Sequence, residues 1–596
     1  MKSIKKALLS ASAAAGLAAI AMPAAAQSTS TTSASEDSTA VDRVIVFGDS
    51  LSDGGFFAAT GALPPGAGSF TTNPDPVAPE VFASQFGLTL DPVYGKGGTN
   101  YAIGGARVTQ PNGITIPIAN QVGNFLATDS FRAGDVVYIQ GGGNDYFAFL
   151  AGGGVNPAIL TSSADALAAQ VARLEAAGAP TIVTMAVQSG GAAPLQAYNA
   201  RFESQLAAQG SNVLYFDTDM LFNELVSQAA SFGITNVTGV ACTVPSSVAC
   251  TRDTLVSPNA NNTYILADSV HPAGISQRVQ GQAIASLLKA PEQIGILALS
   301  QQATLRRQRA SFENEQRNGL GQQGIALFGG IGYGYFDRDG SASRIGGSER
   351  AITGTLGADI ALGDQLGLGI VGGYSDGDGR FDAGRGTFDS ESWSASGYAR
   401  AAVGPAKLIA DVTYGEGDID TVRNVTLGPA LRSQAGATDS KMFAVSGAVR
   451  LDLINGPLVQ IGPEAGIAYE DTDIDGFTEG NMLSTQATFG DQELNSLTGR
   501  FGLVASGSML GGTGFFARAS YVHEFDDDPR SFSITPAGAP VSYSGNLGGL
   551  ERDYASVAMG VNGRVGPVGL RASAGGEFGR GDLDALSASA GLYLPF

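Results

Sequence analysis

The length of 596 residues argues against a single domain, because one ordinary hydrophobic core does not organise so long a chain. The chain has 84 glycines, 15% charged residues and 43% hydrophobic residues, which fits neither a disordered protein nor a helical membrane protein and favours a glycine-tolerant β structure. The formal net charge of −21 argues against nucleic acid as a partner, since phosphate binding requires clustered lysine and arginine.

The N-terminus has the pattern of a secretory signal peptide over residues 1–26. A basic start is followed by an apolar run from Ala7 to Met22 and by small residues that end a cleavage site at Ala26. The alternative, an N-terminal membrane anchor, requires a longer apolar span of about 20 residues. The next segment, 27–40, is rich in serine and threonine and is expected to be a flexible mature N-terminus.

Residues 41–288 alternate short apolar runs with helical patterns. The runs lie at 44–47, 136–139, 181–187 and 213–216, and the clearest helical pattern covers 164–178. Repetition of strand, helix and strand predicts a parallel sheet with helices on both faces, which is a three-layer α/β domain.

The first run leads directly into the sequence GDSLSD, which places Ser50 at the carboxyl end of a strand, where parallel sheets present ligands. Ser50 could be a nucleophile if a base reaches it, or it could simply cap a following helix. The base is available in His271, the only histidine of this domain. Asp268, three residues earlier, can accept a hydrogen bond from one ring nitrogen and leave the other facing Ser50. The sequence therefore predicts a triad of Ser50, His271 and Asp268.

Acyl transfer also requires hydrogen-bond donors for the developing oxyanion. Two segments could supply them, residues 100–105 (NYAIGG) and residues 141–145 (GGGND). Each could instead be an ordinary glycine turn after a strand. The second histidine of the chain is His523, which lies beside Glu524 in the C-terminal half. It is interpreted as a residue in the wall of a β-barrel.

The chain has two cysteines, Cys242 and Cys250, which lie close together in a polar stretch. Export favours a small disulfide-closed loop between them. A metal site is not expected, because two thiols without a nearby histidine provide too few ligands.

Four segments resemble, in order, the conserved blocks of the GDSL or SGNH hydrolases: residues 48–51, 100–105, 142–145 and the pair Asp268-x-x-His271. The resemblance spans about residues 43–285. It implies a flavodoxin-like three-layer hydrolase that needs no cofactor, with Ser50 as nucleophile, His271 as base and Asp268 orienting the base.

The same resemblance implies an oxyanion hole made by the N–H of Ser50, the N–H of Gly105 and the side chain of Asn144. Gly104 is adjacent to Gly105, and either glycine could present the N–H. Apolar residues beside these blocks are expected to line an acyl-binding cleft or to pack in loops: Phe56, Phe57, Phe147, Phe149 and Leu150.

The segment 289–323 is predicted to be a linker built on one long helix. The helical pattern begins at Pro291, continues to residue 318, and is followed by Gly319. Its second half is polar.

From Gly324 to the C-terminus the pattern has a period of two. In the stretch 351–362, Ile352, Leu356 and Ile360 fall on one face, and Thr353 and Asp359 fall on the other. Apolar residues facing out and polar residues facing in are typical of a transmembrane barrel strand.

Twelve such runs are counted in residues 324–596, which predicts a 12-stranded antiparallel transmembrane β-barrel. They lie near 324–337, 350–362, 365–376, 388–403, 405–416, 439–454, 456–470, 493–508, 513–526, 552–565, 567–579 and 585–596. Tight connections alternate with long acidic loops, as in outer-membrane proteins. A soluble β-sandwich, the alternative, has no reason to sort its loops by length.

With this barrel attached, the whole chain resembles the autotransporter esterases and lipases of Gram-negative bacteria. The resemblance implies a linker helix that threads the barrel and a hydrolase displayed on the cell surface. It also implies a lipid or other acyl-ester substrate, contact with outer-membrane lipid, and the barrel-assembly and secretion machinery as partners. Alternatives are a deacetylase or acyltransferase acting on surface polysaccharide, or a non-catalytic, adhesin-like domain.

Overall fold

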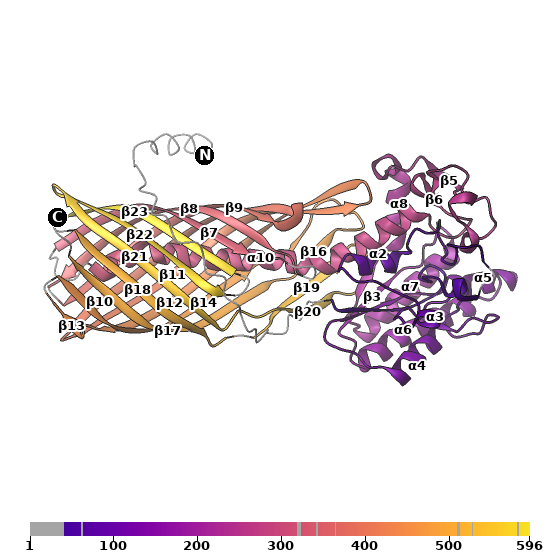
Figure 1. Ribbon diagram of the computed structural model, residues 1–596, viewed down its shortest axis with the longest axis horizontal. Helices are drawn as coiled ribbons and strands as arrows, with labels where there is room; N and C mark the ends of the chain where they lie inside the picture. The colour runs from indigo at the N-terminus through magenta and orange to yellow at the C-terminus, as the bar shows by residue number, and fades with distance from the viewer. Residues whose placement is uncertain are drawn as a thin grey trace. The chain divides into compact units, whose positions relative to one another are not determined.

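The computed structural model describes most of the chain from Val41 onward (Figure 1). The described ranges are 41–60, 63–318, 324–340, 344–363, 365–456, 458–508, 513–526, 528–580 and 583–596. The expected signal peptide, 1–26, and the Ser/Thr-rich segment, 27–40, lie outside the described residues.

The first half of the chain is organised by a parallel four-stranded sheet. Its strands are β1 (Arg43–Phe47), β2 (Asp135–Ile139), β3 (Thr181–Met185) and β4 (Leu214–Phe216), in the order β1-β2-β3-β4. These are the four runs predicted as strands, and nearly all of their residues are buried because helices cover the sheet.

Each face of the sheet carries its own apolar core, so the domain has three layers. One core joins alternate strand residues such as Val46 and Tyr138 to α2 (Ala78–Ser84), α8 (Thr218–Ser227) and the start of α10 (Gly274–Asn318). The other joins the opposite residues of the same strands to three further helices, α4 (Ile118–Thr128), α6 (Ala158–Ala176) and α7 (Ala193–Gln209).

The remaining elements of this half are short. They are η1 (Phe56–Thr60), α3 (Val93–Lys96), α5 (Gly143–Ala151), η2 (Ala229–Phe232), β5 (Asn236–Val240), η3 (Ser247–Ala249), η4 (Arg252–Thr254), α9 (Ala260–Thr263) and β6 (Tyr264–Leu266). Strands β5 and β6 form a separate parallel pair.

Helix α10 is longer than the sequence pattern predicted. It begins at Gly274 and passes through Pro291, which was expected to open it. A proline inside a helix removes one hydrogen bond and crowds the carbonyl four residues earlier. The helix continues because the flanking residues Leu287, Ala290 and Ile294 are all buried in the core.

No helix among the described residues is both long and apolar enough to cross a membrane.

The C-terminal half is a closed antiparallel barrel of twelve long strands, as predicted. Within the described residues these are β7 (Gly324–Arg338), β8 (Gly347–Leu362), β9 (Leu366–Phe381), β10 (Gly386–Val403), β11 (Ala406–Leu427), β12 (Ala430–Leu451), β14 (Val459–Ile474), β17 (Gln492–Ser508), β18 (Gly514–Glu524), β21 (Asp553–Val565), β22 (Val568–Arg580) and β23 (Leu583–Pro595). Pairing of β12 with β14 and of β23 with β7 closes the ring, so no long strand is left with a free edge.

The faces of β8 show the inside and outside of this barrel. Ile352 is 55% exposed and Leu356 is 71% exposed, whereas Thr353 and Asp359 are buried. Apolar side chains on the outer face and polar ones on the inner face suit a barrel whose outer surface meets lipid.

Two strands extend well beyond their predicted limits. β11 and β12 continue as a paired hairpin through the region 417–438, which lies between the strands predicted near 405–416 and 439–454. In this region Asp418 and Asp420 face outward while Ile419 and Val425 are buried, so the alternation has the reverse polarity of a lipid-facing strand, and the ladder runs unbroken to the turn at Gly428, where φ is +60°. Other residues between barrel strands form β13 (Ile454–Asn455), which pairs with β14, the helix η5 (Asp382–Gly384), and a separate sheet of β15 (Phe477–Thr478), β16 (Ala487–Phe489), β19 (Arg530–Pro536) and β20 (Tyr543–Leu547).

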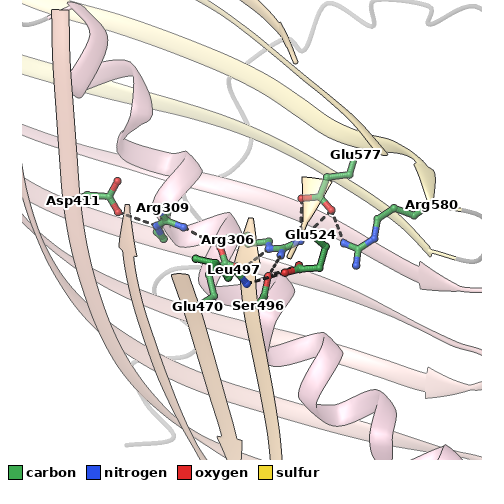
Figure 2. A network of polar contacts seen from close by, with 9 residues as sticks. All are labelled: Arg306, Arg309, Asp411, Glu470, Ser496, Leu497, Glu524, Glu577 and Arg580. Carbon is green, nitrogen blue, oxygen red and sulfur yellow. Dashed lines mark hydrogen bonds and ion pairs between the residues drawn. The ribbon is translucent and has the colours of Figure 1, made fainter. Parts of the chain in front are cut away.

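The polar second half of α10 pairs with charged residues of the barrel strands (Figure 2). Arg306 Nε donates to Glu470 at 2.6 Å, and its Nη1 donates to Glu577 at 3.1 Å. Arg309 donates to Asp411 and Glu470, each at 2.9 Å. Each of these guanidinium groups therefore lies between two carboxylates.

Candidate active site

Ser50 follows the carboxyl end of β1, as its sequence position predicted. Residues 50–52 form a turn, and no helix begins directly after Ser50, so Ser50 does not act as a helix cap. Its Oγ lies 2.9 Å from Nε2 of His271. Ser50 is only 8% exposed, so this contact is largely shielded from water.

His271 is held on its other side by Asp268. Nδ1 of the imidazole lies 2.9 Å from each carboxylate oxygen of Asp268. The three side chains that the sequence nominated, Ser50, His271 and Asp268, thus form one continuous chain of hydrogen bonds. In this arrangement the Nδ1 proton is oriented toward the carboxylate and Nε2 is directed at the serine hydroxyl.

The carboxylate of Asp268 is stabilised in its ionised form. Burial alone would raise its pKa, but the hydrogen bond and the charge of His271, with backbone N–H groups, hold the pKa of Asp268 well below its usual value. The N–H groups of Val270 and His271 donate to Oδ1, and the N–H of Ser247 donates to Oδ2 at 2.6 Å.

Ser247 belongs to the loop between the two cysteines. Cys242 and Cys250 are joined by a disulfide, with their Cα atoms 5.9 Å apart. The loop that this bond closes therefore presents one of its backbone donors to Asp268.

The segment 100–105 lies beside β1. The N–H of Val46 donates to the carbonyl of Thr99, and the N–H of Tyr101 donates to the carbonyl of Val46. This pairing extends the sheet edge and brings Gly104 and Gly105 toward the end of β1.

Asp53 distinguishes the two glycines. The N–H of Gly104 donates to Oδ2 of Asp53 at 2.8 Å. Gly105 has a φ of +82°, and among the described residues no acceptor lies on its N–H. The Gly105 N–H is therefore the one that remains able to donate a hydrogen bond to a bound ligand.

Asn144 lies in the first turn of α5 and is linked to the glycine segment. Its Nδ2 donates to the carbonyl of Ala106 at 3.0 Å, which leaves the second amide proton for another acceptor. The neighbouring Asp145 accepts from Nε of Arg107 and from the N–H of Val108, each at 3.0 Å. These contacts hold residues 144 and 145 against the segment that contains Gly105.

Asp49 is a second buried carboxylate beside Ser50. It accepts a hydrogen bond from Nε2 of Gln140 at 2.7 Å and from the N–H of Leu51 at 3.1 Å. Burial raises the pKa of Asp49 above its usual value, although both hydrogen bonds oppose the shift. Asp49 thereby links the turn that contains Ser50 to Gln140, which directly follows β2.

Three residues that contact the candidate site were not predicted from the sequence: Asp53, Gln140 and Ser247. Asp53 stands three residues after Ser50 and ends the sequence GDSLSD, so its position was a usable signal. Gln140 directly follows β2, at the same edge of the sheet as Ser50. Ser247 carried no signal, because it contributes a backbone N–H whose partner is distant in sequence.

The five apolar residues expected near the site are not equivalent. Phe149 is buried in the core, whereas Phe147 and Leu150 are exposed on α5. Phe56 and Phe57 are half-buried.

His523 lies at the end of β18, with Nδ1 2.7 Å from Asp553, far in sequence from the other candidate residues.

Comparison with known protein families matches both halves of the chain. Residues 44–284 match the family described as GDSL-like lipase/acylhydrolase. Residues 327–577 match the family described as the autotransporter beta-domain.

Curated relatives match along nearly the whole chain. Esterase EstA of Pseudomonas aeruginosa is 26% identical over 629 aligned residues, which cover 93% of this chain and 95% of that protein. Lipase 1 of Photorhabdus luminescens is 23% identical and covers 83% of this chain and 87% of that protein.

Among solved structures, the translocator domain of the autotransporter NalP from Neisseria meningitidis matches 50% of this chain and 98% of that structure, with 15% identity and a TM-score of 0.41. The family matches and the named relatives agree with the α/β domain and the closed barrel described above. The chain is therefore a GDSL-type serine ester hydrolase joined to an outer-membrane autotransporter β-domain, that is, a GDSL autotransporter esterase.

Proposed function

We propose that the chain hydrolyses carboxylic esters at the cell surface through an acyl-Ser50 intermediate. The single observation that supports this most strongly is the continuous hydrogen-bonded chain from Asp268 through His271 to Ser50. Such a chain activates a hydroxyl that is otherwise a weak nucleophile.

In the first half of the reaction, Nε2 of His271 accepts the Ser50 proton while Oγ attacks the ester carbonyl carbon. The charge on the carbonyl oxygen is stabilised by the N–H groups of Ser50 and Gly105 and by Nδ2 of Asn144. His271 then donates its proton to the leaving alcohol. In the second half, His271 activates a water molecule, which releases the acid and regenerates Ser50.

Asp268 keeps the imidazole in the tautomer that leaves Nε2 free to accept a proton. It also stabilises the imidazolium that forms in the transition state. The low pKa of Asp268 supports this role, because the carboxylate remains ionised while His271 gains and loses its proton. Gly105 rather than Gly104 is assigned as the donor, since the Gly104 N–H already donates to Asp53.

We further propose that the barrel-assembly and secretion machinery inserts residues 324–596 in the outer membrane. The linker helix would thread the barrel, and the hydrolase domain would act outside the cell on lipid or other acyl-ester substrates. Support comes from the ion pairs between α10 and the barrel strands and from the match to the autotransporter beta-domain.

The first test is Ser50→Ala in the full-length protein. We expect loss of nearly all esterase activity with retention of the fold, because one Oγ contributes little packing at this position. A fluorophosphonate probe should label the unaltered protein and not the variant. Ser130 is exposed and lies at the end of the parallel strands opposite Ser50, where its carbonyl accepts from the side chain of Arg43, the first residue of β1, so Ser130→Ala serves as the matched control. More than about a tenth of the original activity in Ser50→Ala would contradict the triad.

A further inference from the structure

Four aromatic side chains form a continuous file that starts at the proposed base. The ring centroid of Phe70 lies 4.9 Å from that of His271, and Phe57 follows at 5.8 Å from Phe70. Phe56 is 5.1 Å from Phe57, and Tyr94 is 5.4 Å from Phe56. We call Phe56, Phe57, Phe70 and Tyr94 the aromatic wall.

The aromatic wall is not part of the protein's core. All four side chains are half-buried, and none belongs to the buried apolar clusters found among the described residues. The rings pack edge to face against one another, and each side chain remains partly exposed, so the wall presents apolar surface to solvent. Apolar surface grouped in this way commonly marks a ligand-binding region.

The wall also adjoins the proposed oxyanion donor. A Cβ atom added to Gly104 would lie 2.1 Å from Cε2 of Phe70 and 2.9 Å from Cε2 of Phe57. Only a glycine fits at this point, because any side chain would displace these two rings. The wall therefore begins between His271 and the segment that presents Gly105, where the ester carbonyl must lie during the reaction.

Asp53 fixes the wall and this segment to each other. One carboxylate oxygen accepts the N–H groups of Gly55 and Phe56, at 2.9 and 2.7 Å, and the other accepts the N–H of Gly104. The start of η1, which carries Phe56 and Phe57, is thus held in register with the oxyanion donor. A chain bound on the wall would be aligned with the reacting carbonyl.

We propose that the aromatic wall binds an alkyl chain of the substrate, so that the enzyme favours esters with medium or long chains over acetate esters of short alcohols. This inference rests on the proposed function, since it locates the chain relative to Ser50, His271 and Gly105. The alkyl chain belongs either to the acyl group or to the alcohol, because the wall adjoins both the leaving-group side at His271 and the oxyanion side at Gly104.

The test is Phe57→Ala in the full-length protein, because Phe57 lies one ring farther along the wall from His271 than Phe70 does. One substrate series lengthens the acyl chain of nitrophenyl esters from acetyl to dodecanoyl, and a second lengthens the alcohol of alkyl acetates. We expect kcat/KM for an eight-carbon chain to fall by roughly tenfold in one of the two series, and kcat/KM for the shortest ester by less than about twofold. The series that shows this dependence identifies the half of the ester that the wall binds.

Phe131→Ala is the matched control. Phe131 is also half-buried, but it packs on Phe125 of the core. It precedes β2, at the end of the parallel strands opposite Ser50. Its chain-length profile should equal that of the unaltered protein. Phe70→Ala should steepen the loss for long chains and also slow the shortest ester, since Phe70 packs on His271.

A fall in kcat/KM that is equal for all chain lengths, or absent in both series, would overturn the proposal. This outcome is distinct from a failure of the proposed function, which would appear as hydrolysis that survives Ser50→Ala. The ratio of long-chain to short-chain kcat/KM in Phe57→Ala does not depend on which residue is the nucleophile.

Discussion

Asp53 connects two segments of the candidate active site, the start of η1 and the glycine segment 100–105. Its carboxylate accepts three backbone N–H groups, from Gly55, Phe56 and Gly104. Burial raises its pKa to about 6, and the three hydrogen bonds oppose the rise. The folded protein therefore binds a proton at Asp53 more tightly than the unfolded chain, in which the pKa is close to 3.9.

This shift predicts that stability depends on pH through Asp53. Because the folded-state pKa is raised, the contribution of protonated Asp53 is fully present below about pH 4 and is lost as the pH rises through 6. Asp53→Asn cannot titrate. Between about pH 4.5 and 7.5 we expect the unaltered protein to lose about 2 kcal/mol of stability relative to Asp53→Asn.

The measurement is thermal unfolding followed by the helical circular dichroism signal, at several pH values. Asp42 is an exposed carboxylate near the start of the same domain, so Asp42→Asn provides the control. If the unfolding temperatures of the unaltered protein and of Asp53→Asn change with pH in parallel, Asp53 does not titrate in this range.

At the scale of elements, the disulfide-closed loop between Cys242 and Cys250 supports Asp268 of the proposed triad. The Ser247 N–H donates to Asp268, and the Ser247 carbonyl accepts from Nδ2 of Asn73. The loop is thus held between Asp268 and the segment that leads into α2. Closing so short a loop contributes roughly 2 to 3 kcal/mol in the chain-entropy model.

Removal of the Ser247 N–H, which donates to Asp268, should slow catalysis. Ser247 is the first residue of η3, and Ser246 before it is extended, so proline is tolerated there while the N–H is lost. We expect Ser247→Pro to lower kcat by roughly tenfold to a hundredfold with little change in KM, because Asp268 and His271 lose orientation.

Ser247→Ala keeps the N–H and should retain full activity. Replacement of both cysteines by serine should reproduce part of the loss in kcat. Equal kcat values for Ser247→Pro and Ser247→Ala would show that the loop does not position Asp268.

Helix α10 is the second element considered at this scale, because its arginines pair with carboxylates of the barrel strands. Glu470 accepts hydrogen bonds from both Arg306 and Arg309 (Figure 2). Glu470 is buried, so its removal leaves two guanidinium groups short of a partner. Breaking a buried ion pair in this way costs about 3 to 5 kcal/mol.

Glu470→Gln should therefore loosen the helix from the barrel wall. We expect the temperature at which the unheated electrophoretic form disappears to fall by roughly 10 °C, and the ion conductance in planar bilayers to rise. The exposed Glu493 on neighbouring β17 provides the control, Glu493→Gln. A conductance and a transition temperature equal to those of the control would refute the role assigned to Glu470.

At the scale of the whole molecule, closure of the barrel determines whether the protein can exist in a membrane. β23 pairs with β7 along its full length, from Leu583 opposite Arg338 to Pro595 opposite Ala326. In lipid every backbone polar group must find a partner within the protein, so an open edge is not tolerated.

Deletion of residues 592–596 should consequently prevent assembly. It removes the partners of the first residues of β7 and leaves two strand edges unpaired. We expect no heat-modifiable form on gels and no surface exposure of the hydrolase domain to protease added to whole cells. Ser50→Ala should assemble normally and is the control. A truncated chain that still reaches the surface would disprove this dependence.

The sequence by itself determined the twelve barrel strands, the four parallel strands and the three residues of the proposed triad. Strand alternation and apolar runs are local properties, and a single histidine in the domain left one candidate for the base. Asp268 could be paired with it because the two residues are only three positions apart.

Only the tertiary structure decided the features that depend on contacts between distant residues. It distinguished Gly105 from Gly104 through Asp53, 51 positions away, and it brought Phe70 against His271. It also carried α10 through Pro291, because burial of the flanking residues outweighs the proline penalty. Such outcomes follow from packing and from long-range hydrogen bonds, which no local pattern encodes.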